Sequence, residues 1–264
     1  MKVLLIGGRG YLGRSVSKNL SKYKIYTFDR SKGPKNHFQG SITSFNDVKK
    51  AIEGMDVIIN LVGLSPIKKP ENSYSKVHVL GVRNILFGLT PKQRLIHISA
   101  LGADSSSKNE YLRTKGKAEL LIEGSKAKYA IIRPSILFSK ESEVFTMFSK
   151  PLLFLVPNFK FKFQPVYVDD VAQIIAEILS KKKTGIFQLG GNKKISFYTW
   201  IKSYRAKKGL VTIMLPSTLG KIGIKLAEII GIFPKNTLTL LQNNTSDSTY
   251  KFDYTDYFDW LKKH

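Results

Sequence analysis

The chain has 264 residues, 42% of them hydrophobic, which suits one large α/β domain or one and a half domains. It has no cysteine, which excludes disulfides and thiolate metal sites, and its 43 bases against 19 acids give a formal net charge of +24. No apolar run reaches membrane-spanning length and no signal peptide precedes the first strand, so we expect a cytoplasmic protein without a transmembrane helix. Lysine-rich composition without cysteine is also typical of a thermophile.

A glycine-rich turn directly after the first apolar segment is the most informative feature. Residues 1–6 predict a buried strand, residues 14–20 predict a helix, and Gly7, Gly10 and Gly13 lie between them. In this context the first glycine permits a tight turn, the second lets the backbone approach a pyrophosphate, and the third lets the helix lie close to the strand. The turn therefore predicts dinucleotide contacts from Gly7, Arg9, Gly10, Tyr11, Leu12 and Gly13.

The second predicted strand, residues 24–28, ends at a carboxylate where a ribose-binding acid is expected. Asp29 follows the glycines by about 20 residues, and its carboxylate can accept hydrogen bonds from both hydroxyls of an adenosine ribose. The same charge would repel a 2′-phosphate, whereas Arg9 and Arg30 could pair with that phosphate. The sequence thus favours NAD(H) as the cofactor and leaves NADP(H) as the alternative.

Strands and helices then alternate along the chain. Strands are expected at residues 38–42, 56–61, 94–99, 129–133 and 185–189, and helices at 44–53, 73–89 and 111–125. This rhythm predicts an α/β fold, a Rossmann-like doubly wound parallel sheet with a small C-terminal mixed region for substrate or partner. The expected division assigns 1–140 and 164–190 to the NAD(P)-binding domain, and 141–163 and 191–264 to the smaller region. Because ligands bind at the carboxyl ends of such strands, residues 60–63, 99–103 and 133–135 should surround one crevice.

A tyrosine and a lysine four residues apart supply the candidate chemistry. Tyr111 and Lys115 share one face at the start of the helix after the fifth strand, where they can point at the crevice. A lysine ammonium near the phenol can lower the pKa of the tyrosine, so that it exchanges protons near neutral pH. The same spacing recurs twice beyond the sheet, where surface helix is expected, at Tyr198/Lys202 and Tyr204/Lys208.

The C-terminal third combines a basic zone with an amphipathic segment. No Asp or Glu occurs from Ile178 to Ala227, a stretch that contains eleven Lys and Arg residues. This basic zone indicates an anionic partner or surface, or else a solvated lysine-rich face. Residues 219–233 have apolar side chains at helical spacing, which predicts either a helix packed on the domain or an interfacial helix in a membrane or partner groove.

Several other side chains have expected structural roles. The four histidines are scattered, so no metal site is predicted, and His97 inside a strand should be a packed core residue. Asp169 and Asp170 begin a predicted helix, and at least one of them should cap it. The basic zone contains aromatic residues that would suit a nucleic-acid binder, but no recognised nucleic-acid module is present.

Several segments together resemble the extended short-chain dehydrogenase/reductase superfamily: the glycine turn, residues 56–63, the Tyr111/Lys115 pair and Arg133-Pro134-Ser135. Within it, other segments are most similar to an atypical branch, the NAD(P)H-binding accessory subunit of respiratory complex I (NADH-ubiquinone oxidoreductase). These segments are residues 96–103, 105–107, 111–119, 132–138 and 164–172. The resemblance covers about residues 1–190 and is weaker beyond them.

The resemblance implies roles for individual residues. Tyr111 matches the family's acid/base, and Lys115 matches the lysine on the nicotinamide ribose. Extended members place a substrate-orienting hydroxyl where this chain has Ala100 and Leu101, so Ser99 lies slightly early for that role. Family members commonly have an adenine-contacting Asp at the position of Ser41. Further cofactor contacts are expected from Ser41, Ile42, Leu61, Val62, Gly63, Lys115, Pro134 and Ser135.

Three functions compete. The Tyr111/Lys115 pair favours an NAD(P)-dependent oxidoreductase or nucleotide-sugar epimerase. Ala100, Leu101, the basic zone and the branch resemblance favour a cofactor-holding subunit with slow turnover at most, docked on a respiratory complex or peripherally on an anionic membrane. The branch is thought to bind cofactor tightly without turning over. A basic polyanion-binding protein is the third alternative.

Overall fold

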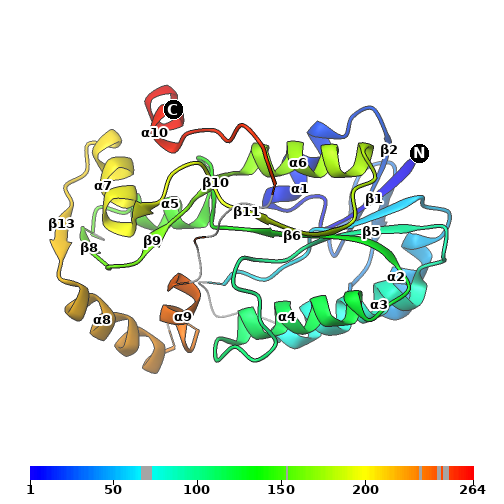
Figure 1. The fold of residues 1–264 in the computed structure, drawn as a ribbon, viewed down its shortest axis with the longest axis horizontal. Coiled ribbons are helices and arrows are strands. Elements are labelled where there is room, and N and C mark those ends of the chain that lie inside the picture. Colours follow the sequence, from blue (N-terminus) through cyan, green and yellow to red (C-terminus); the bar gives the residue numbers. More distant parts are fainter. Residues whose placement is uncertain (67–72, 153, 232–233, 243–244, 246–249) are drawn as a thin grey trace.

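A seven-stranded parallel sheet forms the centre of the molecule (Figure 1). The computed structural model describes residues 1–66, 73–152, 154–231, 234–242, 245 and 250–264. The strands lie in the order β11-β6-β5-β4-β1-β2-β3. They are β1 (Lys2–Ile6), β2 (Lys24–Asp29), β3 (His37–Gln39), β4 (Val57–Asn60), β5 (Arg94–Ile98), β6 (Lys128–Pro134) and β11 (Gly185–Leu189). This is the order of a dinucleotide-binding doubly wound sheet, so the predicted fold class is confirmed.

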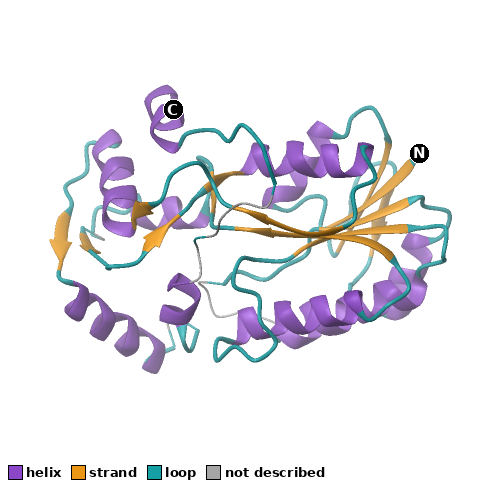
Figure 2. Ribbon diagram, in the orientation of Figure 1, coloured by secondary structure: helices purple, strands orange, loops and turns teal. Residues whose placement is uncertain are grey.

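Helices cover both faces of the sheet, as Figures 1 and 2 show. On one face lie α1 (Tyr11–Asn19) and α6 (Val168–Ser180); on the other lie α2 (Phe45–Ile52), α3 (Gly81–Gly88) and α4 (Glu110–Glu123). Successive side chains of a strand point to opposite faces, so Val3 and Leu5 join one buried cluster while Leu4 and Ile6 join the other. Burial on both faces explains why the central strands are continuous apolar runs.

Side-chain caps set several helix starts. Ser44 accepts a hydrogen bond from the backbone N–H of Asp47 and caps α2, as its position in the sequence predicted. The Asn109 side chain accepts from the N–H of Leu112 at 3.1 Å, and α4 therefore begins at Glu110, one residue before the predicted start.

The structure corrects two predicted elements. Residues 73–89 were predicted as one long helix, but a wide π-helical segment, η1 (Ser75–Leu80), precedes α3. The strand predicted at 38–42 is the shorter β3, because Ser41 already turns toward α2 and donates its N–H to the Asp47 carboxylate. Hydrophobic spacing reports that a segment is helical, but it does not report where the helix widens.

The expected cap at the start of α6 is also wrong. Tyr167 is the N-cap residue of α6 and makes no side-chain capping bond. Asp169 instead accepts a hydrogen bond from the hydroxyl of Ser15 on α1. Asp170 is buried and accepts from the N–H and the hydroxyl of Thr255, both at 2.7 Å. Both carboxylates thus fasten other segments to α6, which is why a local capping rule did not identify their partners.

The remaining elements build a C-terminal lobe beyond the carboxyl ends of the strands (Figure 1). They are β7 (Leu137–Phe138), α5 (Glu143–Phe148), β8 (Leu155–Pro157), β9 (Lys162–Phe163), β10 (Val166–Tyr167), β12 (Ile195–Ser196), α7 (Phe197–Lys207), β13 (Ile213–Leu215), α8 (Ser217–Ile229), α9 (Thr237–Gln242) and α10 (Tyr257–Lys263). Aromatic rings fill the core of the lobe; Phe145, for example, stacks on Tyr204 at 4.1 Å between ring centroids. Arg205 is buried there and donates to the carbonyl oxygens of Phe148 and Lys150.

The end of the chain returns to the sheet. Tyr250, which the expected division placed in the C-terminal region, packs in the hydrophobic cluster under α1 and α6. The division into two domains remains a prediction. The helix predicted at 219–233 begins earlier, as α8, and residues 232 and 233 lie outside the described residues.

The basic zone does not form one surface. Lys181, Lys182 and Lys183 connect the end of α6 to the start of β11, at the amino edge of the sheet, whereas α8 lies beyond the carboxyl edge (Figure 1). Lys181 and Lys183 also form ion pairs with Glu177. The eleven bases therefore do not share one face, and only part of the zone belongs to the lobe.

Helical glycines at two positions give a test of the packing. A Cβ at Gly13 would lie 2.3 Å from the carbonyl oxygen of Gly7, whereas a Cβ at Gly223 in α8 would meet nothing within 4 Å. We expect Gly13→Ala to lower the free energy of unfolding by about 1–3 kcal/mol through overpacking. Gly223→Ala should raise it by up to about 1 kcal/mol, because alanine favours helix. Equilibrium urea unfolding measures both free energies. A Gly13→Ala variant as stable as the wild type would contradict the close approach of α1 to the turn.

Candidate dinucleotide-binding site

The glycine turn has the backbone geometry that a phosphate site needs. Gly7 has a positive φ of 83°, donates its N–H to the Phe28 carbonyl at 2.9 Å, and accepts the N–H of Gly10 at 3.0 Å. Gly10 is the N-cap residue of α1 and has no side chain to cover the first-turn N–H groups. Those donors, with the positive end of the helix dipole, can face an anion.

A carboxylate with a free oxygen lies beside this turn. Asp29 ends β2 and is half-buried, and burial raises the pKa of its carboxyl group, although His37 and Arg9 oppose the shift. Among the described residues, its buried Oδ2 atom has no hydrogen-bond partner. A carboxylate oxygen held away from water without a donor is an acceptor suited to a ribose hydroxyl. These residues therefore fit the adenosine half of a dinucleotide.

The two arginines considered for a 2′-phosphate lie near Asp29 but differ in their contacts. The Arg9 guanidinium donates to the carbonyl oxygen of Lys32, on the loop after β2. Arg30 is exposed, and its carbonyl accepts a hydrogen bond from the side chain of Gln39. Both side chains are exposed, and Arg9 is already engaged by a backbone carbonyl.

The neighbouring strand ends bring more of the predicted residues to the same edge. Leu61 donates its N–H to Ile6, and Val62 donates to the side chain of Asn60, so the segment from Leu61 to Gly63 begins beside the glycine turn. Gly7 itself packs against Val62. The chain thus joins the ends of β1 and β4 at the place where the strand order reverses.

The ends of β5, β6 and β11 form the continuation of this edge. Ser99 donates its N–H to the Ile132 carbonyl at 2.7 Å, and Ser135 after Pro134 donates to Leu189 at 2.8 Å. Both serines are buried, and the Ser99 hydroxyl has no partner among the described residues. Ser99 therefore offers a hydrogen-bonding group at the edge.

Two predicted contacts lie past β3, on the adenine side of the edge. The Ser41 hydroxyl bonds to the hydroxyl of Thr43 at 2.8 Å. Ile42 is buried, and its carbonyl accepts from the side chain of Asn84. Ser41 thus lacks the carboxylate with which the Asp expected at this position would accept a hydrogen bond from the adenine amine.

Lys115 is buried on α4, with its ammonium beside the ends of β4 and β5. Its ammonium donates to the Ile98 carbonyl at 2.9 Å and lies 6.0 Å from the centroid of the Tyr111 ring. A Cβ on Gly63 would lie 3.4 Å from the ammonium, so glycine there leaves room for the lysine. Burial lowers the pKa of Lys115 to about 8, and Glu119 partly opposes that shift.

The expected activation of Tyr111 is not found. Burial, reinforced by Tyr74, raises the pKa of the Tyr111 phenol above its ordinary value of 10.0. The predicted lowering by Lys115 is therefore corrected: the ammonium is directed to a backbone carbonyl, and its charge does not outweigh the desolvation of the phenol.

Sequence reasoning missed two ring partners of Tyr111. The rings of Tyr74 and His78 lie 5.8 Å and 5.5 Å from the Tyr111 ring, both edge-on. Both His78 and Thr114 are buried, and 2.9 Å separates the Nδ1 atom of His78 from the hydroxyl oxygen of Thr114. Tyr74 and His78 are four residues apart within the predicted helix, a spacing that could have suggested one shared face; the π-helical turn between them could not have been foreseen.

The hydrogen bonds define the tautomer of His78. Its Nε2 atom accepts from the backbone N–H of Leu64 at 3.3 Å, and burial lowers the pKa of the ring, so the imidazole is neutral. The proton therefore resides on Nδ1 and is donated to the hydroxyl of Thr114, which in turn donates to the Glu110 carbonyl. This chain of bonds fixes the wall against which Tyr111 packs. His97 is a core histidine as expected and accepts from the Asn60 amide.

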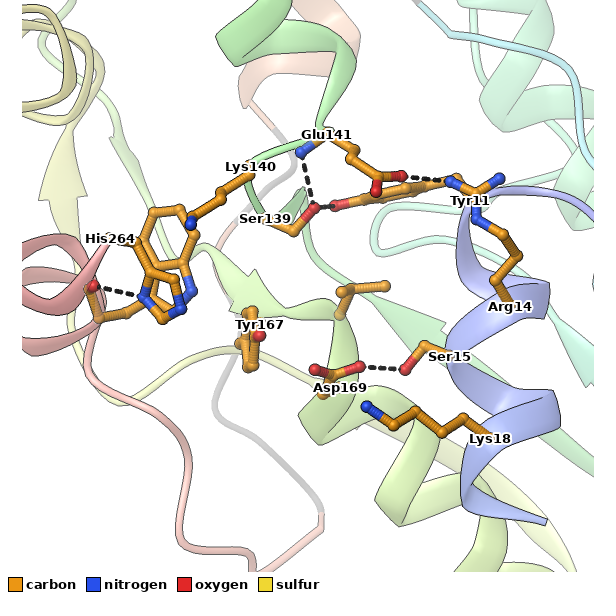
Figure 3. A pocket seen from close by; sticks show the side chains of 12 residues that line it. Tyr11, Arg14, Ser15, Lys18, Ser139, Lys140, Glu141, Tyr167, Asp169 and His264 are labelled. Carbon is orange, nitrogen blue, oxygen red and sulfur yellow. Dashed lines mark hydrogen bonds and ion pairs between the residues drawn. The ribbon is translucent and has the colours of Figure 1, made fainter. Parts of the chain in front are cut away.

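A pocket of about 350 Å³ opens on the other side of the first turn of α1 (Figure 3). The Tyr11 hydroxyl donates to Ser139 at 2.8 Å at its rim, and Arg14 pairs with Glu141. Lys18 and Lys140 also line it. Tyr11 is the one predicted cofactor residue in this pocket, which is separate from the Tyr111/Lys115 pair. Its walls come from four segments that are far apart in the sequence, so local patterns did not predict it.

The strand order and the turn define a Rossmann-type dinucleotide-binding protein. A family model described as NAD(P)H-binding matches residues 7–182. The chain belongs to this NAD(P)H-binding family.

Two curated relatives support the branch resemblance at modest identity. The mitochondrial NADH-ubiquinone oxidoreductase 40 kDa subunit of Neurospora crassa is 28% identical over 152 residues, covering 55% of this chain and 40% of the relative. The mitochondrial NADH dehydrogenase [ubiquinone] 1 alpha subcomplex subunit 9 of Arabidopsis thaliana is 26% identical over 215 residues, covering 71% and 53%. The chain thus spans about half the length of these relatives or less.

A solved structure supports the fold. The human epimerase family protein SDR39U1, in complex with NADPH, superposes with a TM-score of 0.73 at 15% sequence identity, over 100% of this chain and 98% of that chain. At this identity the likeness shows the architecture alone, which includes the C-terminal lobe.

The buried ammonium of Lys115 predicts a pH dependence of stability. Its folded-state pKa of about 8 lies below the ordinary value of 10.5. Below pH 8 both states are protonated, and the folded state bears the full cost of burying the charge. From pH 8 to 10.5 the unfolded state binds more protons, so stability should rise by about 3 kcal/mol.

Urea unfolding of the nucleotide-free protein measures this effect. Wild type should gain stability relative to Lys115→Met across the interval from pH 8 to 10.5, because methionine removes only this titration. Subtracting the variant cancels the tyrosines and other lysines that titrate above pH 9. Parallel stability curves for the two proteins would show that Lys115 ionises as it does in water.

Proposed function

We propose that this protein holds a nicotinamide dinucleotide in the crevice along the carboxyl edge of the sheet, with its pyrophosphate at the first turn of α1. The single observation that supports this most strongly is that a helix start without a side-chain cap lies near a buried Asp29 oxygen that has no hydrogen-bond partner among the described residues. The turn supplies donors for a diphosphate, and the carboxylate supplies an acceptor for ribose hydroxyls. Membership of the NAD(P)H-binding family agrees with this proposal.

NAD(H) is the proposed cofactor of the two. The Asp29 charge would repel a 2′-phosphate, and Arg9 is engaged with the Lys32 carbonyl. Arg30 alone, exposed to solvent, is a weak counter-charge because water and salt screen it.

The nicotinamide half would lie farther along the edge. Lys115 would donate to the nicotinamide ribose from its position beside Gly63, and Ser99 and Ser135 would border the ring. The hydrogen bond from Lys115 to Ile98 holds the ammonium ready for that contact. Pro134, before Ser135, limits the backbone at the same point.

The protein would serve mainly to hold this cofactor rather than to turn it over quickly. A phenol with a raised pKa is a poor proton donor and acceptor near neutral pH, because the best catalytic pKa lies close to the working pH. Leu101 is buried and apolar at a position where extended reductases have an orienting hydroxyl. A nucleotide-holding subunit of a larger respiratory assembly fits both features and the similarity to the two relatives.

Nucleotide titration tests the proposal. NADH fluorescence should rise saturably with added protein, and Gly10→Asp should abolish the rise, because its carboxylate would lie against the pyrophosphate. Gly223→Asp is the matched control: it adds the same charge on α8, where a Cβ has open space, and should leave binding unchanged.

The same titration with NADPH tests the choice of cofactor. NADH should bind at least as tightly as NADPH, and Asp29→Asn should shift the preference toward NADPH. A tenfold preference of the wild type for NADPH, about 1.4 kcal/mol, would mean that Arg30 and Arg9 outweigh Asp29. If neither nucleotide binds below millimolar concentration, the proposed function is wrong, even though the fold stands.

A further inference from the structure

Helix α8 has two apolar faces, and the larger one is exposed. Gly220 and Ile224 face the lobe; a Cβ on Gly220 would lie 2.6 Å from the Pro157 side chain at the end of β8. Four aliphatic residues at helical spacing form the exposed row and are between 52% and 79% exposed: Leu219, Ile222, Leu226 and Ile229. Ile230, directly after the helix, is 70% exposed. The helix is thus anchored by one narrow face while its main apolar face points to solvent.

The strand pair beside α8 continues this apolar surface. Strands β8 and β13 pair in parallel, and their register partners Leu155 and Ile213 are both about half exposed. Met214 is 52% exposed and Val211 72%. Strand β13 leads directly into α8 at the same end of the lobe (Figure 1). We call the exposed row of α8 together with these strand residues the α8–β13 surface.

Monomeric proteins rarely expose so many large aliphatic side chains in adjacent elements. The charged side chains of α8 have one sign apart from Glu228, and β8 and β13 carry none. Lys221 and Lys225 are exposed on α8 beside the apolar row. Residues 144–168 contain no acid, and neither do residues 178–227, so β8, β13 and nearly all of α8 come from acid-free sequence. The one acid within α8, Glu228, accepts from the N–H of Thr237 and so is turned toward α9. A partner of this surface must therefore be apolar at its centre and anionic around it.

The composition distinguishes a bilayer from a protein partner. Protein interfaces are enriched in tyrosine, tryptophan and arginine and depleted in lysine, and their strongest contacts seldom come from leucine or valine. Apart from Met214, the α8–β13 surface consists of aliphatic side chains, and lysines border it. Helices that lie in the plane of a membrane combine such features, because lysine stems extend their charges to the headgroups.

We propose that the α8–β13 surface docks the protein on an anionic lipid bilayer, with α8 lying in the headgroup region. None of the described helices is long and apolar enough to cross a membrane, so α8 would bind along the surface. The proposal goes beyond nucleotide holding and uses other elements: α8 lies in the lobe, away from the glycine turn (Figure 1). Nucleotide binding can therefore fail while docking holds, and docking can fail while nucleotide binding holds.

Vesicle co-sedimentation tests the proposal with the full chain. The protein should sediment with phosphatidylglycerol/phosphatidylcholine vesicles at about 0.1 M salt, where surface charges act over about 10 Å. It should bind pure phosphatidylcholine vesicles at least about tenfold more weakly, because each lysine near an anionic surface favours binding.

Two pairs of variants separate docking from general charge attraction. Leu226→Gln with Ile229→Gln keeps the net charge and should weaken binding to anionic vesicles at least about tenfold. Its control, Phe87→Gln with Leu120→Gln, removes equally exposed apolar residues from α3 and α4 and should change nothing. Lys221→Gln with Lys225→Gln should also weaken binding about tenfold or more. Its control, Lys117→Gln with Lys126→Gln, removes the same charge from the sheet domain and should not.

The absence of cysteine allows a direct readout of depth. The emission of an environment-sensitive dye on Ile229→Cys should shift to the blue with anionic vesicles, whereas that of the same dye on Leu120→Cys should not.

Three outcomes would overturn the proposal. Equal weakening of vesicle binding by the lysine pair and by its control would mean unspecific attraction. A concentration-dependent dimer, seen by sedimentation velocity, that Leu226→Gln with Ile229→Gln dissociates would also overturn it, because a second copy would then cover the surface. A protein that stays in the supernatant with anionic vesicles overturns it as well.

Discussion

The close approach of α1 to the end of β1 is the constraint on which the rest of the structure depends. Gly13 brings the helix within a distance of the Gly7 carbonyl that no side chain would allow. The glycine turn follows β1, which lies between β2, ending at Asp29, and β4 in the sheet. The start of α1, with first-turn N–H groups that no side chain caps, is thereby held beside the glycine turn, where the proposed diphosphate would bind.

The chemistry of the crevice is governed by burial. Desolvation lowers the pKa of Lys115 to about 8 and raises the pKa of Tyr111, so the two groups move toward neutral forms. The neutral His78 packs beside Tyr111 and is held by Leu64 and Thr114. The Tyr111 phenol is therefore not poised for proton transfer near neutral pH, whereas the Lys115 ammonium titrates close to it.

The sequence predicts the sheet well because strands, turns and helices are recognised from patterns between neighbouring residues. Strand, glycine turn and helix occur within residues 1–20, and Asp29 follows at the expected distance, so the order of the first elements needed no tertiary information. The failures involve distant partners. Asp170 binds Thr255, and Tyr111 packs against a π-helical turn, and no periodicity reports such contacts. The exposure of α8 is another case: its spacing predicts an amphipathic helix, but only the fold shows which apolar face remains uncovered.

The most direct test of the central claim is a crystal structure of the protein grown with NADH. We expect the pyrophosphate against the first-turn N–H groups of α1 and the adenosine ribose hydroxyls on the Asp29 carboxylate, with Lys115 at the nicotinamide ribose. The pocket lined by Arg14 and Lys18 offers the clearest alternative position for a nucleotide phosphate. A dinucleotide bound in that pocket, with the glycine turn and Asp29 left uncontacted, would contradict the account.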